Sequence, residues 1–227
     1  MRKRRYEALL IDFYGTICAG DREAVEATCA HIVESCGLDL TPPELAIRWG
    51  EQFFSDVDQS NHDAFRTLNE CEIESLRTTL ARFGCTADPE PLVAPLEEYW
   101  LNPEIYEDAI AFLESVRLPV CCVSNADTEP LRAAMDRHGL VFDAVITSED
   151  ARAYKPDAEI FRQALSALDV SPEATIHVGD SLHSDIGGAS MLGISTAWIR
   201  RDSRIHDIGN SHPDWTFATL TEMSGII

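Results

Sequence analysis

The sequence predicts an α/β protein with a Rossmann-like, doubly wound parallel sheet and a smaller helical domain inserted after the first strand. Residues 7–13 form a short, almost continuous apolar run that a glycine soon follows, as in a buried strand. Residues 19–98 show helical patterns and no strand pattern, whereas strands and helices alternate from about residue 103 onward. Such alternation is typical of a parallel sheet covered by helices on both faces. Because the first strand has no other partner, we assign two domains: a core of residues 1–18 and 99–227, and an inserted helical domain of residues 19–98.

Capping residues and glycines indicate the helix ends in the inserted block. Thr41, Pro42 and Glu44 form a capping box with proline at the first helical position. Gly37 and Gly84 follow the ends of two helical patterns. The predicted helices cover residues 22–36, 42 to about 57, about 62–83, and a segment after Asp88 and Pro89.

The second half of the chain alternates between helices and apolar strands. The predicted helices are 104–116, 128–138, 157–168 and 184–192, and the strands that follow them are 118–124, 142–147, 174–179 and 194–199. In an open parallel sheet, ligands bind outside the carboxyl ends of the strands. Candidate functional residues are therefore expected where these strands end.

The chain is strongly acidic, with 39 Asp and Glu against 18 Lys and Arg and a formal net charge of -21. This charge repels nucleic acids and anionic membrane surfaces, and no segment approaches the roughly 20 apolar residues of a membrane span. The seven cysteines are odd in number, lack zinc spacing and accompany no secretion signal, which favours reduced thiols. We expect a cytoplasmic monomer or homodimer that acts on a small molecule, without nucleic-acid or membrane partners.

Several polar residues fall at the predicted strand ends. Asp12 closes the first strand, Asp180 follows the strand at 174–179, and Asp185 begins the next helix. Ser124 and Asn125 end another strand, and Lys155 lies in the loop before the helix predicted at 157–168. Taken singly, such residues are commonly turn formers, helix caps or solvated side chains. Together, carboxylates that converge in so acidic a chain favour a divalent cation such as Mg²⁺, and an Asp among them can act as a nucleophile.

These residues resemble the four motifs of the haloacid dehalogenase-like (HAD) hydrolase superfamily. The resembling segments are, in order, Asp12-Phe13-Tyr14-Gly15-Thr16, Ser124-Asn125, Lys155-Pro156, and GDSLHSD from Gly179 to Asp185. The resemblance covers residues 8 to about 200, and it implies that Asp12 is the nucleophile and that the acids of the fourth motif bind Mg²⁺. It also implies that the inserted helices form a mobile cap that closes over the substrate and selects it.

Tyr14 stands where two branches of this superfamily differ. Phosphatases usually carry a second Asp there, which protonates the leaving group and later activates water, whereas tyrosine, with a reference pKa of about 10, is a poor base at neutral pH. The D-x-Y-G-T form instead resembles the 2-haloacid dehalogenases, in which halide leaves without a proton. Arg48 resembles the arginine that this branch carries in its cap near the substrate carboxylate. The equal alternative is that Arg48 is an ordinary surface residue of a helix. The segment from His212 to Trp215 resembles its P-D-W segment, which we expect to begin a last short strand.

Three positions depart from the dehalogenase branch, which has Ser, Asn and Tyr where this chain has Asp180, Leu182 and Phe161. The resemblance also implies that this branch needs no metal. Asp180 would place a full charge near the carboxylate of a haloacid, which is unfavourable without a cation. The fourth motif therefore favours Mg²⁺ and phosphate chemistry.

We favour a Mg²⁺-dependent phosphatase of a small phosphorylated metabolite that works through an aspartyl-phosphate intermediate. The assigned residues are Asp12, Lys155 and Ser124 for catalysis, Tyr14, Gly15, Thr16, Asn125 and Arg48 for substrate binding, and Asp12, the Tyr14 carbonyl, Asp180 and Asp185 for the metal. The alternatives are a metal-free 2-haloacid dehalogenase that forms an aspartyl ester, and a catalytically weak binding protein on the same fold. Arg200, Arg201 and Arg204 form a basic spot that we interpret as a solvated loop.

Overall fold

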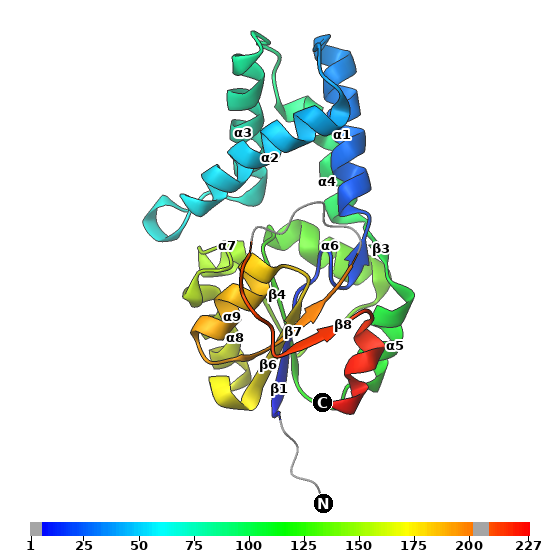
Figure 1. Cartoon of the computed structure of the whole chain (residues 1–227), viewed down its shortest axis with the longest axis vertical. Helices are drawn as coiled ribbons and strands as arrows, with labels where there is room; N and C mark the ends of the chain where they lie inside the picture. Colours follow the sequence, from blue (N-terminus) through cyan, green and yellow to red (C-terminus); the bar gives the residue numbers. More distant parts are fainter. Residues whose placement is uncertain (1–5, 202–208) are drawn as a thin grey trace, which may run out of the picture.

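A six-stranded parallel sheet forms the centre of the protein. The structure, a computed structural model, describes residues 6–201 and 209–227. The strands lie in the order β5-β4-β1-β6-β7-β8, and all neighbouring pairs are parallel. They are β1 (Ala8–Ile11), β4 (Val120–Ser124), β5 (Ala144–Thr147), β6 (Thr175–Gly179), β7 (Ser195–Ile199) and β8 (Trp215–Phe217). Helices cover both faces of this sheet (Figure 1), which confirms the predicted α/β architecture.

Side chains of β1 alternate between the two faces of the sheet. Leu9 packs in a cluster that includes Phe112 of α5, whereas Leu10 packs on the opposite face with Phe161 of α8. The helices of the core are α5 (Glu107–Ser115), α6 (Thr128–His138), α7 (Ser148–Ala151), α8 (Ala158–Leu168) and α9 (Gly188–Met191), with the shorter elements η3 (Pro172–Ala174), η4 (Leu182–Gly187) and η5 (Leu220–Gly225). All four residues of β1 are fully buried, so this strand is covered by apolar side chains on both faces.

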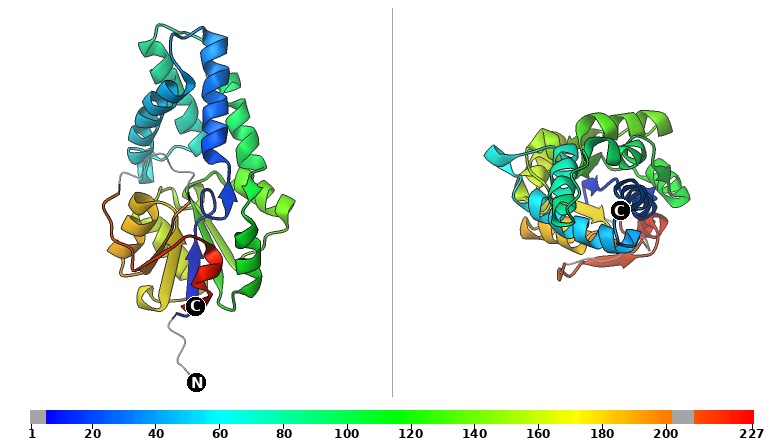
Figure 2. Two further views of the ribbon diagram at one scale, coloured as in Figure 1. Left: turned by 45° about the vertical axis from the view of Figure 1, so that its right-hand side comes forward. Right: turned by 90° about the horizontal axis from the view of Figure 1, so that it is seen from above.

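The segment between β1 and β4 contains a second group of helices, which we call the helical unit. Its elements are α1 (Asp21–Cys36), α2 (Pro42–Asp58), η1 (His62–Ala64), α3 (Leu68–Arg82), η2 (Glu90–Leu92) and α4 (Ala94–Leu101). They share an apolar cluster of their own, with Ile32, Leu45 and Leu76 fully buried in it. Figures 1 and 2 show the helical unit standing over one end of the sheet, with α1 continuing directly from β2.

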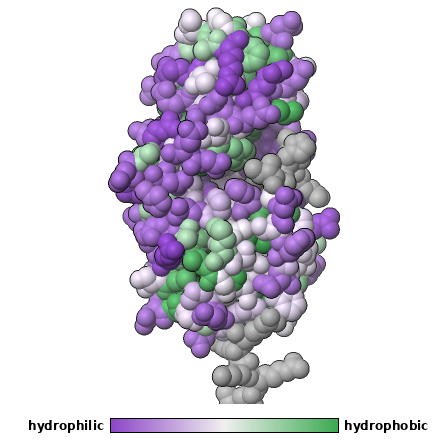
Figure 3. All heavy atoms as spheres, turned by 60° about the vertical axis from the view of Figure 1, so that its left-hand side comes forward, coloured by the Kyte–Doolittle hydropathy of each residue, from purple (hydrophilic) through white to green (hydrophobic). Residues whose placement is uncertain are grey.

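A short antiparallel ribbon joins the helical unit to the core. Its two strands are β2 (Cys18–Ala19) and β3 (Glu104–Ile105). The predicted domain boundary at residues 98 and 99 falls inside α4, so the chain leaves the helical unit only at the ribbon. Hydrophilic residues cover most of the helical unit on the face drawn in Figure 3, in keeping with the acidic composition.

Most predicted helices and strands lie close to their observed bounds, but two helix starts were wrong. The helix predicted from residue 62 begins at Leu68, because His62 adopts a left-handed φ of 56° and Thr67 forms the N-cap with a capping box. The helix predicted at 104–116 begins at Glu107, because the first two residues pair with β2. In both places the chain makes a contact that the local helical pattern does not reveal.

Two statements hold for the described part of the chain as a whole. All seven cysteines carry free thiols. Within residues 6–201 and 209–227, none of the helices combines the length and apolar character that crossing a bilayer requires.

Candidate active site

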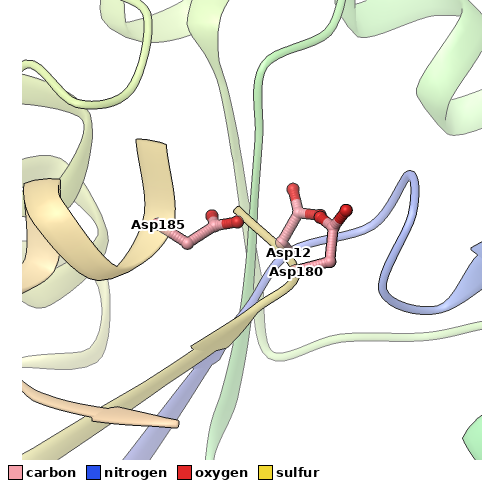
Figure 4. Close-up of side chains that lie close together, drawn as sticks. All are labelled: Asp12, Asp180 and Asp185. Carbon is pink, nitrogen blue, oxygen red and sulfur yellow. The ribbon is translucent and has the colours of Figure 1, made fainter. Parts of the chain in front are cut away.

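Three carboxylates meet at the carboxyl ends of the central strands. Asp12 follows β1, Asp180 follows β6, and Asp185 lies in the π-helical turn η4 (Figure 4). One oxygen from each lies within 4.8 Å of the others. Their exposed fractions are 4%, 4% and 1%, so all three carboxylates are withdrawn from bulk water. This is the convergence that the sequence predicted for the strand ends.

Strand pairing and two glycines allow the close approach. β1 and β6 are neighbours in the sheet, with Ile11 opposite Val178, so the residues that follow them emerge side by side. Gly15 has φ of 86°, and a Cβ there would lie 2.7 Å from Asp180 Oδ2. A Cβ on Gly179 would overlap the carboxyl group of Asp185. Any larger residue at either position would displace a carboxylate.

Lys155 connects two of the carboxylates. Its Nζ donates to Asp12 Oδ1 and to Asp185 Oδ1, both at 2.6 Å, and to the Val123 carbonyl oxygen at 2.9 Å. The Asn125 side chain fixes the loop that carries this lysine, because its Nδ2 donates to the Lys155 carbonyl and its Oδ1 accepts from the Lys155 amide. Asn125 therefore positions the lysine through both ends of its amide.

Burial, the Lys155 ammonium and the neighbouring carboxylates all act on the pKa values of this cluster. Burial raises the pKa of Asp12 to about 7, with repulsion from Asp185 and Asp180 adding to it and Lys155 opposing it. Burial also disfavours the charged form of Lys155, but its two carboxylate partners outweigh this and raise its pKa above the usual value. The Lys155 ammonium and a hydrogen bond from His177 hold the pKa of Asp185 below its usual range despite burial. A divalent cation would offset the repulsion that Asp12 experiences from these two carboxylates.

His177 is a site residue that the sequence analysis missed. It lies in the middle of β6 with no exposed surface, and its Nε2 is 3.0 Å from Asp185 Oδ1. The Ser181 amide donates to the other Asp185 oxygen at 3.0 Å. These two contacts fix the orientation of the carboxylate. The signal in the sequence was a polar side chain in the middle of an otherwise apolar buried strand.

The remaining residues of the first two motifs are also buried. Thr16 has no exposed surface, and its Oγ1 has no hydrogen-bond partner among the described residues. Ser124 ends β4, which pairs with β1, and is 1% exposed. A buried hydroxyl without a partner is unfavourable, and a bound substrate oxygen would satisfy it.

Tyr14 is engaged away from the carboxylates. Its hydroxyl donates to the Trp100 carbonyl oxygen at 2.6 Å, and the two rings pack edge to face with centroids 4.8 Å apart. Burial raises the pKa of the phenol further above its usual value. The Tyr14 hydroxyl is thus unsuited to act as a base.

The structure does not bring Arg48 to the carboxylates. Its side chain is exposed on α2, with the guanidinium carbon 5.8 Å from the centre of the Phe83 ring. Phe83 follows the C-terminal end of α3, whereas the N-terminal end of α3 contacts the core. Arg48 therefore lies near the end of α3 that is remote from the sheet.

The N-terminal end of α3 is bound to core loops beside the site. Asp127, at the N-cap position of α6, accepts hydrogen bonds from the backbone amides of Leu68 and Asn69 at 2.7 and 3.0 Å. Tyr154, next to Lys155, donates its hydroxyl hydrogen to the Arg66 carbonyl at 2.8 Å. The helical unit therefore contacts the core immediately beside the lysine.

Comparison with known proteins gives two kinds of relative. The phosphoserine phosphatase of Thermus thermophilus is 32% identical over 124 residues, which cover 52% of this chain and 49% of that protein, so the match spans about half of the relative's length. The (S)-2-haloacid dehalogenase of Pseudomonas sp. (strain YL) is 22% identical over 218 residues, covering 94% of this chain and 91% of that protein. The two relatives carry out different reactions, so similarity alone does not decide between them.

The fold and the family are clear from two further comparisons. The structure of Bacillus subtilis YfnB bound to magnesium has a TM-score of 0.78 at 23% identity, and the match covers 98% of this chain and 99% of that one. The family model of haloacid dehalogenase-like hydrolases matches residues 6–193. With the four motifs gathered at one edge of the sheet, the chain belongs to the haloacid dehalogenase-like hydrolases.

Proposed function

We propose that the protein is a Mg²⁺-dependent phosphatase that acts on a small phosphorylated metabolite. The observation that carries this proposal is the convergence of Asp180 with Asp12 and Asp185 within 4.8 Å. A dehalogenase that forms an ester on Asp12 does not require a third buried carboxylate close to its substrate. A phosphatase uses it to hold a metal ion against the phosphoryl oxygens.

The residues present fit Mg²⁺. All candidate ligand atoms are oxygens, which are the donors that this ion prefers. Asp12, Asp180, Asp185 and the Tyr14 carbonyl are the groups we assign to hold it. Burial raises the pKa of Asp12 and repulsion from Asp185 and Asp180 adds to it, and two positive charges would offset this repulsion. When bound, the ion would neutralise charge on the phosphoryl group.

The remaining roles in the proposed reaction are assigned to side chains and backbone of the chain itself. Asp12 attacks phosphorus, a bond forms between its carboxylate oxygen and phosphorus, and the ester oxygen leaves with its bonding electrons. Water then attacks phosphorus, the bond between phosphorus and the Asp12 oxygen breaks and restores the Asp12 carboxylate, and phosphate leaves as the released protons pass to solvent. Lys155, Ser124 and Thr16 hold phosphoryl oxygens, and the backbone at Gly15 keeps the loop close to Asp180. Asn125, predicted as a substrate ligand, is assigned instead to positioning Lys155, because both ends of its amide are occupied.

The leaving group follows from the state of Tyr14. Its hydroxyl is bonded to Trp100 and cannot serve as the second acid of the first motif. Substrates whose leaving oxygen needs no proton, such as aryl and acyl phosphates, should therefore react faster than alkyl phosphates. We propose that the helical unit, predicted as residues 19–98, is the cap that encloses such substrates, as the interdomain movement reported for YfnB supports.

Metal-free dehalogenation is the second candidate, favoured by Tyr14 and by the dehalogenase relative whose match spans 94% of this chain. The position of Arg48 weighs against it, because this guanidinium lies beside Phe83 and away from the carboxylates. A non-catalytic binder is the third candidate, and the buried Asp12–Lys155 pair weighs against it.

One pair of assays separates these candidates. Purified protein is incubated with p-nitrophenyl phosphate and acetyl phosphate with Mg²⁺ or EDTA, and with 2-chloropropionate in EDTA. We expect phosphate release that requires both Mg²⁺ and Asp12, shown by loss in Asp12→Asn and retention in the exposed control Asp39→Asn. Chloride release in EDTA without phosphatase activity would replace the proposal with the dehalogenase. Turnover of none of these substrates would favour the binder.

A further inference from the structure

A pocket lies at the junction of the helical unit and the core, and the proposed reaction uses none of the residues that line it. Its volume is about 430 Å³. Its lining includes Gly20, Arg22 and Glu23 from the start of α1, and Arg200 and Arg201 from the segment after β7. The pocket is therefore lined by residues of both the helical unit and the core.

Several arginines line this pocket in a strongly negative protein, two of them paired with Glu26 and Asp108. The chain has 18 Lys and Arg against 39 Asp and Glu, yet among the described residues three arginines and a single carboxylate line this pocket. Arg22 pairs with Glu26 only through an exposed contact of 2.9 Å, which is weakly stabilising. Arg200 is exposed, with its guanidinium carbon 5.9 Å from the centre of the Trp198 ring. An anion would find two incompletely balanced guanidinium groups facing the same space.

Arg201 gives the pocket a fixed inner wall. Its side chain is 7% exposed, and its Nη2 donates to both oxygens of Asp108 at 3.0 Å and to the Thr16 carbonyl at 3.1 Å. The guanidinium lies over the Tyr106 ring at 3.9 Å. Its Nε is buried without a hydrogen-bond partner among the described residues. The interpretation of Arg201 as part of a solvated loop was wrong, because this side chain is held inside the junction; Arg204 lies outside the described residues.

The start of α1 adds a further favourable feature. α1 has 16 residues, and its N-cap is Gly20, which has no side chain to bond the free amides of the first turn. Such amides and the helix dipole favour an anion. Asp21 and Glu23 in the first turn oppose this effect, so the arginines must supply most of the attraction.

From these observations we infer that the pocket binds a small phosphate-type oxyanion, held between Arg22 of α1 and Arg200 and Arg201 after β7. Guanidinium groups suit this ligand because they present paired N–H donors to its oxygens. The anion would link the first helix of the helical unit to the core. This site shares no residue with the carboxylate cluster and does not depend on the proposed reaction.

The test is calorimetric titration with inorganic phosphate in EDTA, where the negatively charged carboxylate cluster repels this probe. The double variant Arg22→Ala/Arg200→Ala removes the two exposed cations and leaves the Arg201–Asp108 pair intact. The matched control is Arg77→Ala/Arg162→Ala, which removes the same charge from two other exposed arginines, remote from the pocket, that pair within their own helices. Thermal unfolding of both variants verifies that they are folded.

We expect the natural protein and the control to bind one phosphate with equal affinity, and the Arg22/Arg200 variant to bind at least roughly tenfold more weakly. Binding that falls equally in both variants would show a net-charge effect and overturn the proposal. Absence of binding to the natural protein at millimolar phosphate would overturn it as well.

Discussion

Replacing Asp180 by Asn should make the protein more stable than the natural protein in EDTA and less stable than the natural protein in saturating Mg²⁺. At the 4.8 Å that bounds the three ligand atoms, two ionised carboxylates repel by about 3.5 kcal/mol at an effective dielectric constant of about 20. Lys155 and partial protonation of Asp12 offset most of this repulsion. We therefore expect Asp180→Asn to raise the free energy of unfolding by about 1 kcal/mol in EDTA. With Mg²⁺ at 100 times its dissociation constant, the natural protein gains about 2.7 kcal/mol, and the variant loses most of that gain.

Thermal unfolding measures both effects. One kcal/mol corresponds to about 2–4 °C in Tm for a protein of this size, so saturating Mg²⁺ should raise the Tm of the natural protein by about 5–10 °C. The exposed Asp39→Asn removes one negative charge elsewhere and should retain the full increase. An equal Tm increase in Asp180→Asn and the natural protein would contradict this prediction, as would a natural protein whose Tm does not change with Mg²⁺.

Three further outcomes are expected. Lys155→Met should lower the free energy of unfolding by about 3 kcal/mol at pH 8 in a denaturant titration, because it leaves buried carboxylates without their ammonium; a loss below about 1 kcal/mol would contradict this. Burial raises the pKa of Glu72, which is 2% exposed, to about 8. The folded state therefore holds a proton that the unfolded state releases near pH 4.5. This contribution to the free energy of unfolding is lost as pH rises from about 5 to 8. Glu72→Gln should therefore weaken the fall in stability over that range, whereas the exposed Glu74→Gln should retain it, and equal pH profiles would disprove this role. Arg48→Ala should change kcat/KM for p-nitrophenyl phosphate by less than about twofold, since this side chain lies far from the carboxylates.

The carboxylate cluster could be predicted because its position depends on few choices. Strand–helix alternation requires a parallel sheet, and parallel strands direct their carboxyl ends to one edge. Asp12 and Asp180 follow neighbouring strands directly, so their proximity follows from topology alone. Asp185 is brought back by the turn of η4, and Lys155 by a loop that Asn125 fixes.

The helical unit was harder to predict because its helices are oriented by contacts distant in sequence. The start of α3 depends on Asp127 of the core, which receives the amides of Leu68 and Asn69. A helical pattern shows which residues share a face, but not which end of the helix faces the sheet. For this reason the sequence predicts that Arg48 lies on a helix, but it does not show that Arg48 lies near the end of α3 that is remote from the site. His177 was not predicted as a site residue for a similar reason, because its partner Asp185 lies outside the strand that contains His177.

For the proposed function, the charge of the site favours phosphate over haloacid chemistry more firmly than Tyr14 favours the opposite choice. A haloacid would bring its own carboxylate to a site where burial and two neighbouring carboxylates already raise the pKa of Asp12 to about 7. The Lys155 ammonium is engaged with Asp12 and Asp185 at 2.6 Å, and Arg48 lies elsewhere. A phosphate ester brings negative charge as well, but it can arrive with a divalent cation that three oxygen ligands are arranged to hold. Under this proposal, Tyr14 at the position of a proton donor limits which leaving groups depart readily, whereas Asp180 determines which substrates the site can accept.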